Sequence, residues 1–255
     1  MISILKTKTS RRNTPELADL FNFLKNKNNS EFNSRIFTFL NPYTYLIGRK
    51  NPELYNKFNH IFIDGMLLVK FLNFFSVSDC ERKSFDMTSI APFVFEQAAN
   101  NKLSVYFIGA KDDIVDKSID NIKNKFPGLK ISGFRNGYFF DNNEKIRVIK
   151  NITALNPDIV ITGMGAPLQE EFLIELLNNN WSGIGFSCGG FIHQTAKKLY
   201  YYPHFVDKFS LRWLYRIYDE PYLFKRYFLE YPKFIFIFLY DLLKNHFNKG
   251  IEKKI

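Results

Sequence analysis

Short apolar runs and stretches with helical apolar spacing alternate along the middle of the chain. Each run of strand length is followed by a segment in which apolar residues recur every three or four positions. The expected strands are 35–40, 61–63, 104–108, 130–132, 158–162 and 181–187. The expected helices are 42–50, 64–75, 89–100, 112–125, 143–156 and 169–178. This alternation predicts an α/β fold with a parallel sheet, flanking helices and right-handed crossovers.

The two ends of the chain differ from this middle. Residues 14–27 have helical spacing and Thr14-Pro15-Glu16 suits a helix start, whereas the polar stretch 25–33 is typical of a loop. Beyond Tyr200 the pattern changes to aromatic and basic helices. We therefore expect a Rossmann-like α/β core over residues 1–196 and a C-terminal helical appendage over residues 197–255.

Charge and aromatic content single out the appendage. The chain of 255 residues is long enough for a core domain with an appendage, and it holds 29 Phe and 14 Tyr with a net charge of +10. From Lys197 onward 12 Lys and Arg face 6 Asp and Glu. A basic segment of this kind favours an anionic partner: nucleic acid, an anionic membrane or a phosphorylated substrate.

The tail interleaves cations with large aromatic residues, as in Arg212-Trp213-Leu214-Tyr215-Arg216. The apolar run within residues 231–240 is too short to span a bilayer but suits a segment that lies in the membrane interface. The alternative is an aromatic helix packed on the core. No nucleic-acid recognition motif accompanies the charge, so we expect no nucleic-acid partner.

Cysteine usage and the N-terminal sequence bear on the compartment. Cys80 and Cys188 lie far apart without metal-type spacing, which favours free thiols in a reducing compartment. The start of the chain has no signal-peptide pattern, and no run of about 20 apolar residues occurs. These features predict a cytoplasmic protein without a spanning helix.

The stretch Asn156–Phe172 joins a buried strand, a glycine turn and a helix start. Gly163 and Gly165 allow a tight turn and a close approach to a ligand, and Pro167 suits the first turn of a helix. Ligands of open α/β sheets bind beyond the carboxyl ends of the strands, where a helix N-terminus favours an anion. Gln169 can bind a sugar hydroxyl or a base edge. The alternative is an ordinary turn in which Gln169 and the two glutamates after it only complement the helix dipole.

Asp64 follows the short apolar strand 61–63 and precedes a helix. That position places a carboxylate at the mouth of the sheet, where it can act as a general base on a bound hydroxyl. A helix N-cap is the alternative role for Asp at such a position.

Other motifs point to other chemistries. Gly185-Phe186-Ser187-Cys188-Gly189 matches the nucleophile elbow of serine hydrolases, for which Asp219 and His246 are the available partners. Gly163-Met164-Gly165 lacks the third glycine of a dinucleotide site. The four histidines have no metal-ligand spacing, so no metal site is expected. A serine hydrolase and a non-enzymatic membrane-binding module therefore stand as alternatives to a transferase.

Several segments together resemble the WecG/TagA/CpsF family of bacterial glycosyltransferases, which is glycosyltransferase family 26 and includes N-acetylmannosaminyltransferases. The resemblance extends from about Phe37 to Tyr227. The motifs are Leu40-Asn41-Pro42, Ile63-Asp64-Gly65, Arg82 with Asp86, Phe107-Ile108-Gly109-Ala110, Gly133-Phe134-Arg135-Asn136-Gly137-Tyr138-Phe139, Gly163-Met164-Gly165-Ala166-Pro167-Leu168-Gln169-Glu170, and Trp213-Leu214-Tyr215-Arg216 through Glu220-Pro221 to Arg226-Tyr227.

The resemblance implies an inverting transfer from a UDP-sugar donor to a lipid-diphosphate-linked sugar acceptor, without a metal or other cofactor. The family's usual reaction adds N-acetylmannosamine to undecaprenyl-diphosphate-linked N-acetylglucosamine, and other members move other hexoses for capsule or lipopolysaccharide. The implied location is peripheral, on the inner face of the cytoplasmic membrane, with the tail on the anionic lipid surface. A homo-oligomer is compatible with this reading.

The motifs also imply roles for single residues. Asp64 would be the general base, Asn41 and Gln169 would position the sugars, and Arg82 would shape the donor pocket. The further substrate-binding positions are Gly109, Gly137, Tyr138, Gly165 and Glu170. An inverting transfer needs stabilisation of the departing diphosphate as well as a base, and Arg216 and Arg226 are the candidate cations. Because both lie on the tail, docking on lipid is expected to complete the active site.

Three positions depart from the family pattern. Phe39 stands where Thr is frequent, Phe191-Ile192 lacks the carboxylate of the common Phe-Asp pair, and an expected arginine is missing between Pro221 and Arg226. These departures predict a donor sugar other than the family's usual one.

Overall fold

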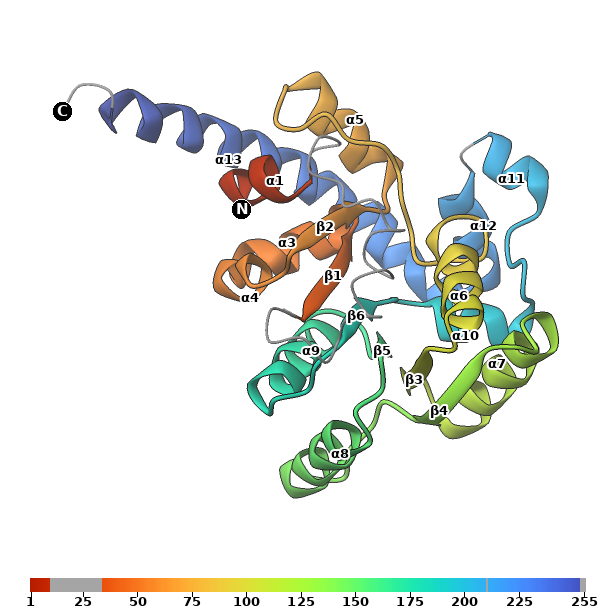
Figure 1. The fold of residues 1–255 in the computed structure, drawn as a ribbon. Helices are drawn as coiled ribbons and strands as arrows, with labels where there is room; N and C mark the ends of the chain where they lie inside the picture. Colours follow the sequence, from red (N-terminus) through yellow and green to blue (C-terminus); the bar gives the residue numbers. More distant parts are fainter. Residues whose placement is uncertain (10–33, 210, 253–255) are drawn as a thin grey trace.

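The protein, seen in a computed structural model, folds around a six-stranded sheet (Figure 1). The structure describes residues 1–9, 34–209 and 211–252, so the helix expected at 14–27 and the loop at 25–33 lie outside it. The strands are β1 (Arg35–Leu40), β2 (His60–Ile63), β3 (Ser104–Gly109), β4 (Lys130–Arg135), β5 (Ile159–Gly163) and β6 (Ile184–Ser187). Their order is β2-β1-β6-β5-β3-β4, and every pairing is parallel. The predicted α/β fold is confirmed.

Successive residues of each strand alternate between two hydrophobic cores, because side chains of a strand point to opposite faces in turn. In β1, Ile36 belongs to one core and Phe37 to the other. In β5, Val160 joins the first core while Ile159 and Ile161 join the second. Both faces of the sheet are therefore covered, which explains why its strands are apolar throughout.

Helices cover both faces. The core that contains Phe37 is closed by α6 (Ile90–Asn100), α7 (Asp112–Lys125) and α10 (Phe191–Lys197). The core that contains Ile36 is closed by α1 (Ile2–Lys8), α3 (Pro42–Lys50), α4 (Pro52–Asn56), α5 (Met66–Phe74), α8 (Asn142–Leu155) and α9 (Leu168–Asn178), and by part of the C-terminal helix.

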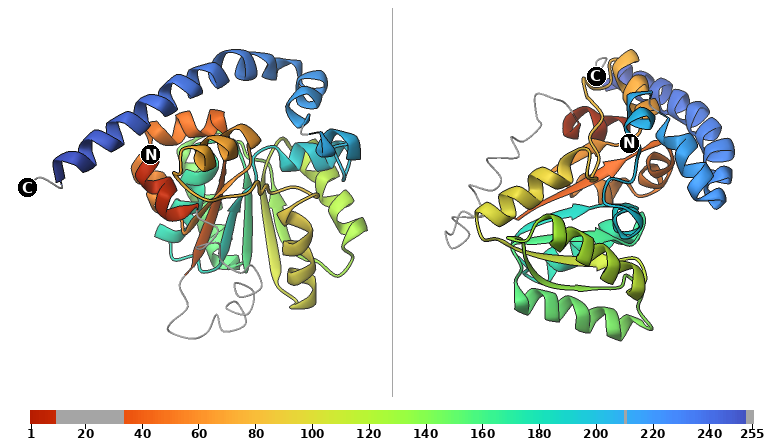
Figure 2. Two further views of the ribbon diagram at one scale, coloured as in Figure 1. Left: turned by 90° about the horizontal axis from the view of Figure 1, so that it is seen from above. Right: turned by 90° about the vertical axis from the view of Figure 1, so that its right-hand side faces the viewer.

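The C-terminal segment crosses the carboxyl ends of the strands and then runs back along the molecule (Figure 2). It consists of α11 (His204–Lys208), α12 (Arg212–Asp219), the 3₁₀ turn η2 (Pro221–Leu223), the π-helical turn η3 (Arg226–Glu230) and α13 (Tyr231–Glu252). Within the residues that the structure describes, no helix is long and apolar enough to cross a bilayer.

The long helix α13 has two unlike faces. Phe234 and Phe238 are completely buried against Tyr45 and Phe71, and Asp241 accepts hydrogen bonds from Arg49 and Tyr45. Over residues 231–247 of the helix, the exposed apolar side chains are Phe236, Leu239, Tyr240, Leu243 and Phe247. With about 100° between successive residues, these five lie opposite Phe234, Phe238 and Asp241. Packing on the core and an exposed apolar face therefore coexist on this helix.

Candidate active site

A cavity of about 960 Å³ lies where the carboxyl ends of the strands meet the C-terminal segment. One wall, which we call the strand-end wall, is formed by Asn41, Asp64, Ala110, Gly137, Met164, Gly165, Gln169 and their neighbours. The opposite C-terminal wall includes Arg212, Arg216, Arg226, Tyr227 and Tyr231. Ligands of open parallel sheets bind at this edge, so the cavity is the candidate active site.

Asp64 lies at the end of β2, and its backbone N–H bonds to the carbonyl of Leu40 at 2.8 Å. The following helix α5 has Gly65 as its N-cap and no side-chain cap, so the alternative role of Asp64 as an N-cap is wrong. About 40% of the Asp64 side chain is exposed, and that exposed part faces the cavity. The carboxylate is therefore accessible to a bound substrate.

The surroundings of Asp64 suit a general base. Although part of the Asp64 side chain faces the cavity, the surrounding protein desolvates its carboxyl and raises its pKa. The Arg82 guanidinium acts in the opposite direction, and the charge of Asp86 raises the pKa further. A carboxylate with a raised pKa is a better proton acceptor than an exposed one, provided it is ionised at the working pH.

Arg82 reaches Asp64 because the connection between α5 and α6 runs beside β2. Arg82 forms a parallel bridge with Ile63, and its Nη1 lies 3.3 Å from Oδ1 of Asp64. The same Nη1 donates to Oγ of Ser84 at 3.0 Å. Arg82 thus contacts the candidate base directly, in addition to lining the cavity as the sequence predicts.

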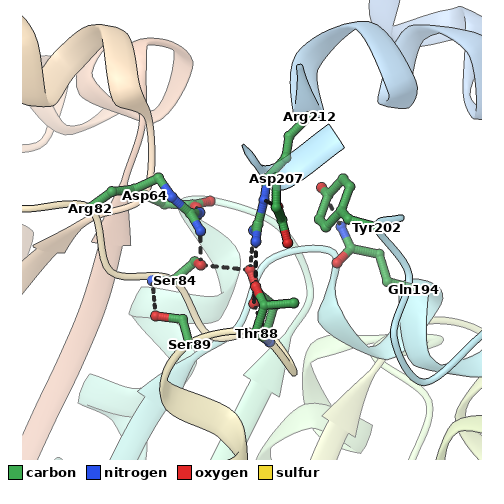
Figure 3. A network of polar contacts seen from close by, with 10 residues as sticks. Asp64, Arg82, Ser84, Thr88, Ser89, Gln194, Tyr202, Asp207 and Arg212 are labelled. Atoms are coloured by element: carbon green, nitrogen blue, oxygen red, sulfur yellow. Dashed lines mark hydrogen bonds and ion pairs between the residues drawn. The ribbon is translucent and has the colours of Figure 1, made fainter. Parts of the chain in front are cut away.

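The polar network continues from Ser84 to the C-terminal wall (Figure 3). Ser84 donates to Oδ2 of Asp86 at 2.6 Å, and Arg212 of α12 donates to the same oxygen at 2.6 Å. Arg212 also bonds to Thr88 and Asp207 and stacks on the ring of Tyr202 at 4.4 Å. Although burial alone would raise it, Arg212 and the hydrogen bonds of Ser84 and Thr88 hold the pKa of Asp86 below its usual value.

The two predicted amide residues line the cavity but also bond within the protein. Oδ1 of Asn41 caps α3 by accepting from the backbone N–H groups of Tyr43 and Thr44. Gln169 is almost fully buried, donates to Glu170 at 2.8 Å and accepts from the backbone N–H of Gly189 at 3.2 Å. Both amides are therefore fixed in orientation before any sugar binds.

Glu170 lies beneath the cavity instead of lining it. Its Oε1 accepts from Thr38 and Gln169, each at 2.8 Å, and burial raises the pKa of its carboxyl. Oγ of Thr38 also bonds to Oγ of Ser187 at 2.8 Å. This places Glu170 behind Gln169, where it can orient the amide.

The hydrolase alternative is wrong. Ser187 is completely buried in β6 and its hydroxyl bonds to Thr38, so it is not the exposed serine that a nucleophile elbow requires. Asp219 bonds to Lys197 and Tyr201 instead of to a histidine.

The predicted glycines divide into two groups. Gly137 and Gly165 line the cavity beside Tyr138, and Gly165 has a φ of 79° that favours glycine. Gly109 does not line the cavity. A Cβ at Gly109 would lie 2.5 Å from the carbonyl oxygen of Gly163, so this glycine allows β3 and β5 to approach.

Two arginines present charge to the cavity from the C-terminal wall. Arg216 is mostly buried and bonds to Glu220 at 2.5 Å, while its Nε has no hydrogen-bond partner within the described residues. Arg226 lies 4.2 Å from the centre of the Tyr43 ring. No ion pair of Arg226 occurs in the described part of the chain, so its charge is available to an anion.

Sequence reasoning missed Arg212 and three tyrosines of the cavity, Tyr202, Tyr227 and Tyr231, as members of the site. Arg212 precedes Arg216 by four residues, which places both on one helix face and could have indicated the pair. In residues 1–9, 34–209 and 211–252 no three His, Cys, Asp or Glu side chains are grouped as metal ligands.

Comparisons with known proteins identify a family and several named relatives. The model of the glycosyl transferase WecG/TagA/CpsF family matches residues 2–248. A Shigella boydii UDP-Gal:alpha-D-GlcNAc-diphosphoundecaprenol beta-1,4-galactosyltransferase is 37% identical over 84% of this chain and 90% of its own length. An N-acetylglucosaminyldiphosphoundecaprenol N-acetyl-beta-D-mannosaminyltransferase of Bacillus spizizenii is 30% identical over 56% of this chain and 54% of its own length. The enzyme of that name from Bacillus subtilis is 28% identical over 54% of this chain and 52% of its own length.

Proposed function

The chain belongs to the WecG/TagA/CpsF family of glycosyl transferases, and from this premise we propose that it transfers a hexose from a UDP-sugar to N-acetylglucosamine carried on undecaprenyl diphosphate. The observation that carries the proposal is the Asp64 carboxylate, which faces a cavity large enough for a nucleotide sugar and an acceptor sugar. The alternative of a non-enzymatic module has no support from the family match or from this site.

In the proposed reaction the acceptor hydroxyl attacks the anomeric carbon of the donor sugar. Asp64 takes the hydroxyl proton while the new C–O bond forms and the bond to the UDP oxygen breaks, so UDP leaves with the bonding electrons. A single displacement of this kind inverts the anomeric centre. No other residue with a carboxylate and a raised pKa lines the cavity in the described chain.

The departing diphosphate needs positive charge. Arg226 and Arg216 face the cavity from the side opposite Asp64, and preorganised cations stabilise developing negative charge most effectively in a partly enclosed site. We assign the diphosphate to this C-terminal wall and the reacting sugars to the space between it and Asp64.

We propose galactose as the donor sugar. The relative named as a galactosyltransferase matches most of this chain, whereas the relatives named as mannosaminyltransferases match about half of it. Phe39, which lines the cavity at a position where Thr is frequent in the family, supports a donor other than N-acetylmannosamine. Ile192 is buried in the core and does not line the cavity, so it does not bear on the donor.

We further propose that residues 1–196 form the transferase core and residues 197–255 an appendage that docks on the inner face of an anionic membrane. The support is the exposed apolar face of α13, with Lys233 and Lys244 at its border. Docking there would hold the cavity near a lipid-linked acceptor. A homo-oligomer stays a prediction that light scattering of the purified protein tests.

The deciding experiment measures product from UDP-galactose, UDP-glucose, UDP-N-acetylglucosamine and UDP-N-acetylmannosamine. The acceptor is lipid-diphosphate-linked N-acetylglucosamine in anionic liposomes, and Asp64→Asn is the matched variant. We expect transfer by the wild type, fastest from UDP-galactose, and about 10³-fold less by Asp64→Asn with UDP binding retained. No transfer from any donor by UDP-binding wild type, or full activity of Asp64→Asn, would refute the proposal.

A further inference from the structure

One network of hydrogen bonds and ion pairs connects the candidate base to the C-terminal wall. Its members are Asp64, Arg82, Ser84, Asp86 and Arg212, and each neighbouring pair is within 3.3 Å. Figure 3 labels four of them: Asp64, Arg82, Ser84 and Arg212. The network joins three segments of the protein: the end of β2, the connection between α5 and α6, and α12.

Asp86 is the centre of this network, and both of its carboxylate oxygens accept two hydrogen bonds. Oδ2 accepts from Ser84 and Arg212, and Oδ1 accepts from the backbone N–H of Thr88 at 2.8 Å and from its hydroxyl at 2.7 Å. Asp86 is buried. A buried carboxylate with four donors has one orientation, so it fixes the side chains that bond to it.

Arg212 is also held in one orientation by its contacts. Its three nitrogens bond to Asp207, Asp86 and Thr88, and its plane stacks on the ring of Tyr202. Because these partners lie outside α12, Arg212 ties α12 to the connection between α5 and α6.

We infer that Asp86 is a positioning residue: it holds α12 through Arg212 and, through Ser84, holds Arg82 in the orientation in which its guanidinium contacts Asp64. The geometry makes Ser84 the only link between Asp86 and Arg82 in the described network. We call these five residues, from Asp64 to Arg212, the clasp. The inference rests on the proposed role of Asp64 as the base, and the clasp holds the C-terminal wall in a fixed position relative to that base. Small displacements of positioned groups lower rates strongly, by about 10²-fold for 1 Å.

Several charged and titratable groups face Asp64, and they set the expected pH behaviour. They are Arg82 and Asp86 from the connection between α5 and α6, Arg212 and Arg216 from α12, and Tyr202, Tyr227 and Tyr231 from the loops and helices above the cavity. Arg82 lowers the pKa of Asp64 and Asp86 raises it.

Two variants separate the clasp from a merely structural role. Ser84→Ala keeps every charge but removes the hydroxyl that holds Arg82 beside Asp64. Because the Arg82 guanidinium lowers the pKa of Asp64, that pKa should rise when Arg82 moves away, and kcat should fall about tenfold. Asp86→Asn keeps an oxygen for Ser84 but removes the negative charge, so the pKa of Asp64 should fall. The acid limb of the kcat/KM profile should follow, to higher pH in Ser84→Ala and to lower pH in Asp86→Asn.

The matched control is Asp219→Asn. Asp219 also ties α12 to the core, through a 2.7 Å ion pair with Lys197 of α10, but among the described residues no hydrogen-bond path connects it to Asp64. We expect wild-type kcat and an unmoved acid limb for this variant.

The readouts are kcat and KM for the UDP-sugar, the pH profile, and the pKa of Asp64 from NMR of protein labelled at the aspartate carboxyl carbons, assigned with Asp64→Asn. Opposite shifts in the two variants support the clasp. An unmoved Asp64 pKa in Ser84→Ala, shifts of the same sign in both variants, or equal shifts in Asp219→Asn would overturn it. The NMR titration does not require turnover, so it tests the clasp even if the proposed transfer fails.

Discussion

The strand-end wall and the C-terminal wall of the cavity are built by different means. On the strand-end wall, turns at the ends of β-strands present Asp64 and amides whose orientation is fixed by local hydrogen bonds. The C-terminal wall presents arginines and tyrosines on short helices that are held by ion pairs and by the buried side of α13. Under the proposed function, proton transfer takes place on a rigid sheet edge, and the diphosphate binds to a segment that also carries the proposed membrane-binding face.

The largest expected effect comes from removing the anchor of the C-terminal wall. Phe238→Ala deletes a completely buried ring and should lower the free energy of unfolding by about 3–5 kcal/mol, because the cavity left behind cannot close fully. Urea unfolding measures this loss. Leu243→Ala, on the exposed face of the same helix, is the control and should change it little; equal losses would show that α13 is not anchored by its inner face.

Acid should destabilise the fold first through His60, which lies at the amino end of β2, away from the cavity. Burial lowers the pKa of His60 to about 4, below its usual value, so the folded state prefers the neutral ring. This contribution is complete above about pH 6.5 and is lost as the pH falls towards 4, a loss of roughly 3 kcal/mol. The contribution of Asp86, whose pKa is lowered, is lost only at still lower pH.

Urea unfolding at pH 7, 5.5 and 4.5 measures the histidine effect, with His60→Phe as the comparison. The variant should lack the part of the pH dependence that lies between pH 6.5 and 4. If wild type and variant lose stability in parallel over this range, His60 is not the cause.

Charge on the C-terminal wall should affect transfer more than folding. Arg226→Gln removes a cation that has no acidic partner in the described network, so kcat/KM should fall about tenfold to hundredfold with little change in the free energy of unfolding. Lys225→Gln, on the adjacent exposed residue, is the charge-matched control. Equal rates for both variants would remove Arg226 from the diphosphate site.

The smallest effect is expected on the outer face of α13. Phe236 is 74% exposed, and Phe236→Ser should weaken binding to anionic liposomes roughly threefold to tenfold while leaving stability unchanged. Flotation with liposomes measures the binding, and neutral liposomes provide the reference. Unchanged binding would place the membrane contact elsewhere.

Local signals predicted much of the fold. The helices 42–50 and 112–125 have the predicted bounds, since Asn41 and Pro42 mark one start and paired aspartates the other. In contrast, α10 begins after Gly189-Gly190, a pair that is unfavourable for a helix start. That helix is stabilised by distant partners, including the hydrogen bonds of Ser118 and Asn121 to Thr195, which no local pattern contains.

Sequence patterns likewise predicted most residues of the candidate site but not the contacts between distant segments. The position of Asp64 follows from strand and turn patterns, and nine of the eleven predicted positions line the cavity. Gly109 and Glu170 do not, because one allows two strands to approach and the other lies a layer below. The pairing of Asp86 with Arg212 spans 126 residues of sequence and depends on how α12 returns to the sheet, so spacing alone could not predict it.

The two faces of α13 should have diverged under different selection during evolution. At Phe234 and Phe238 the volume of the side chain is constrained, since each fills a closed space, so substitutions that survive should be aromatic or accompanied by changes in Tyr45 or Phe71. At Phe236, Tyr240 and Leu243 only affinity for an apolar surface would matter. Related proteins should therefore carry residues of different size on this outer face. Within one helix, side-chain volume should be conserved on the buried face and only apolar character on the exposed face.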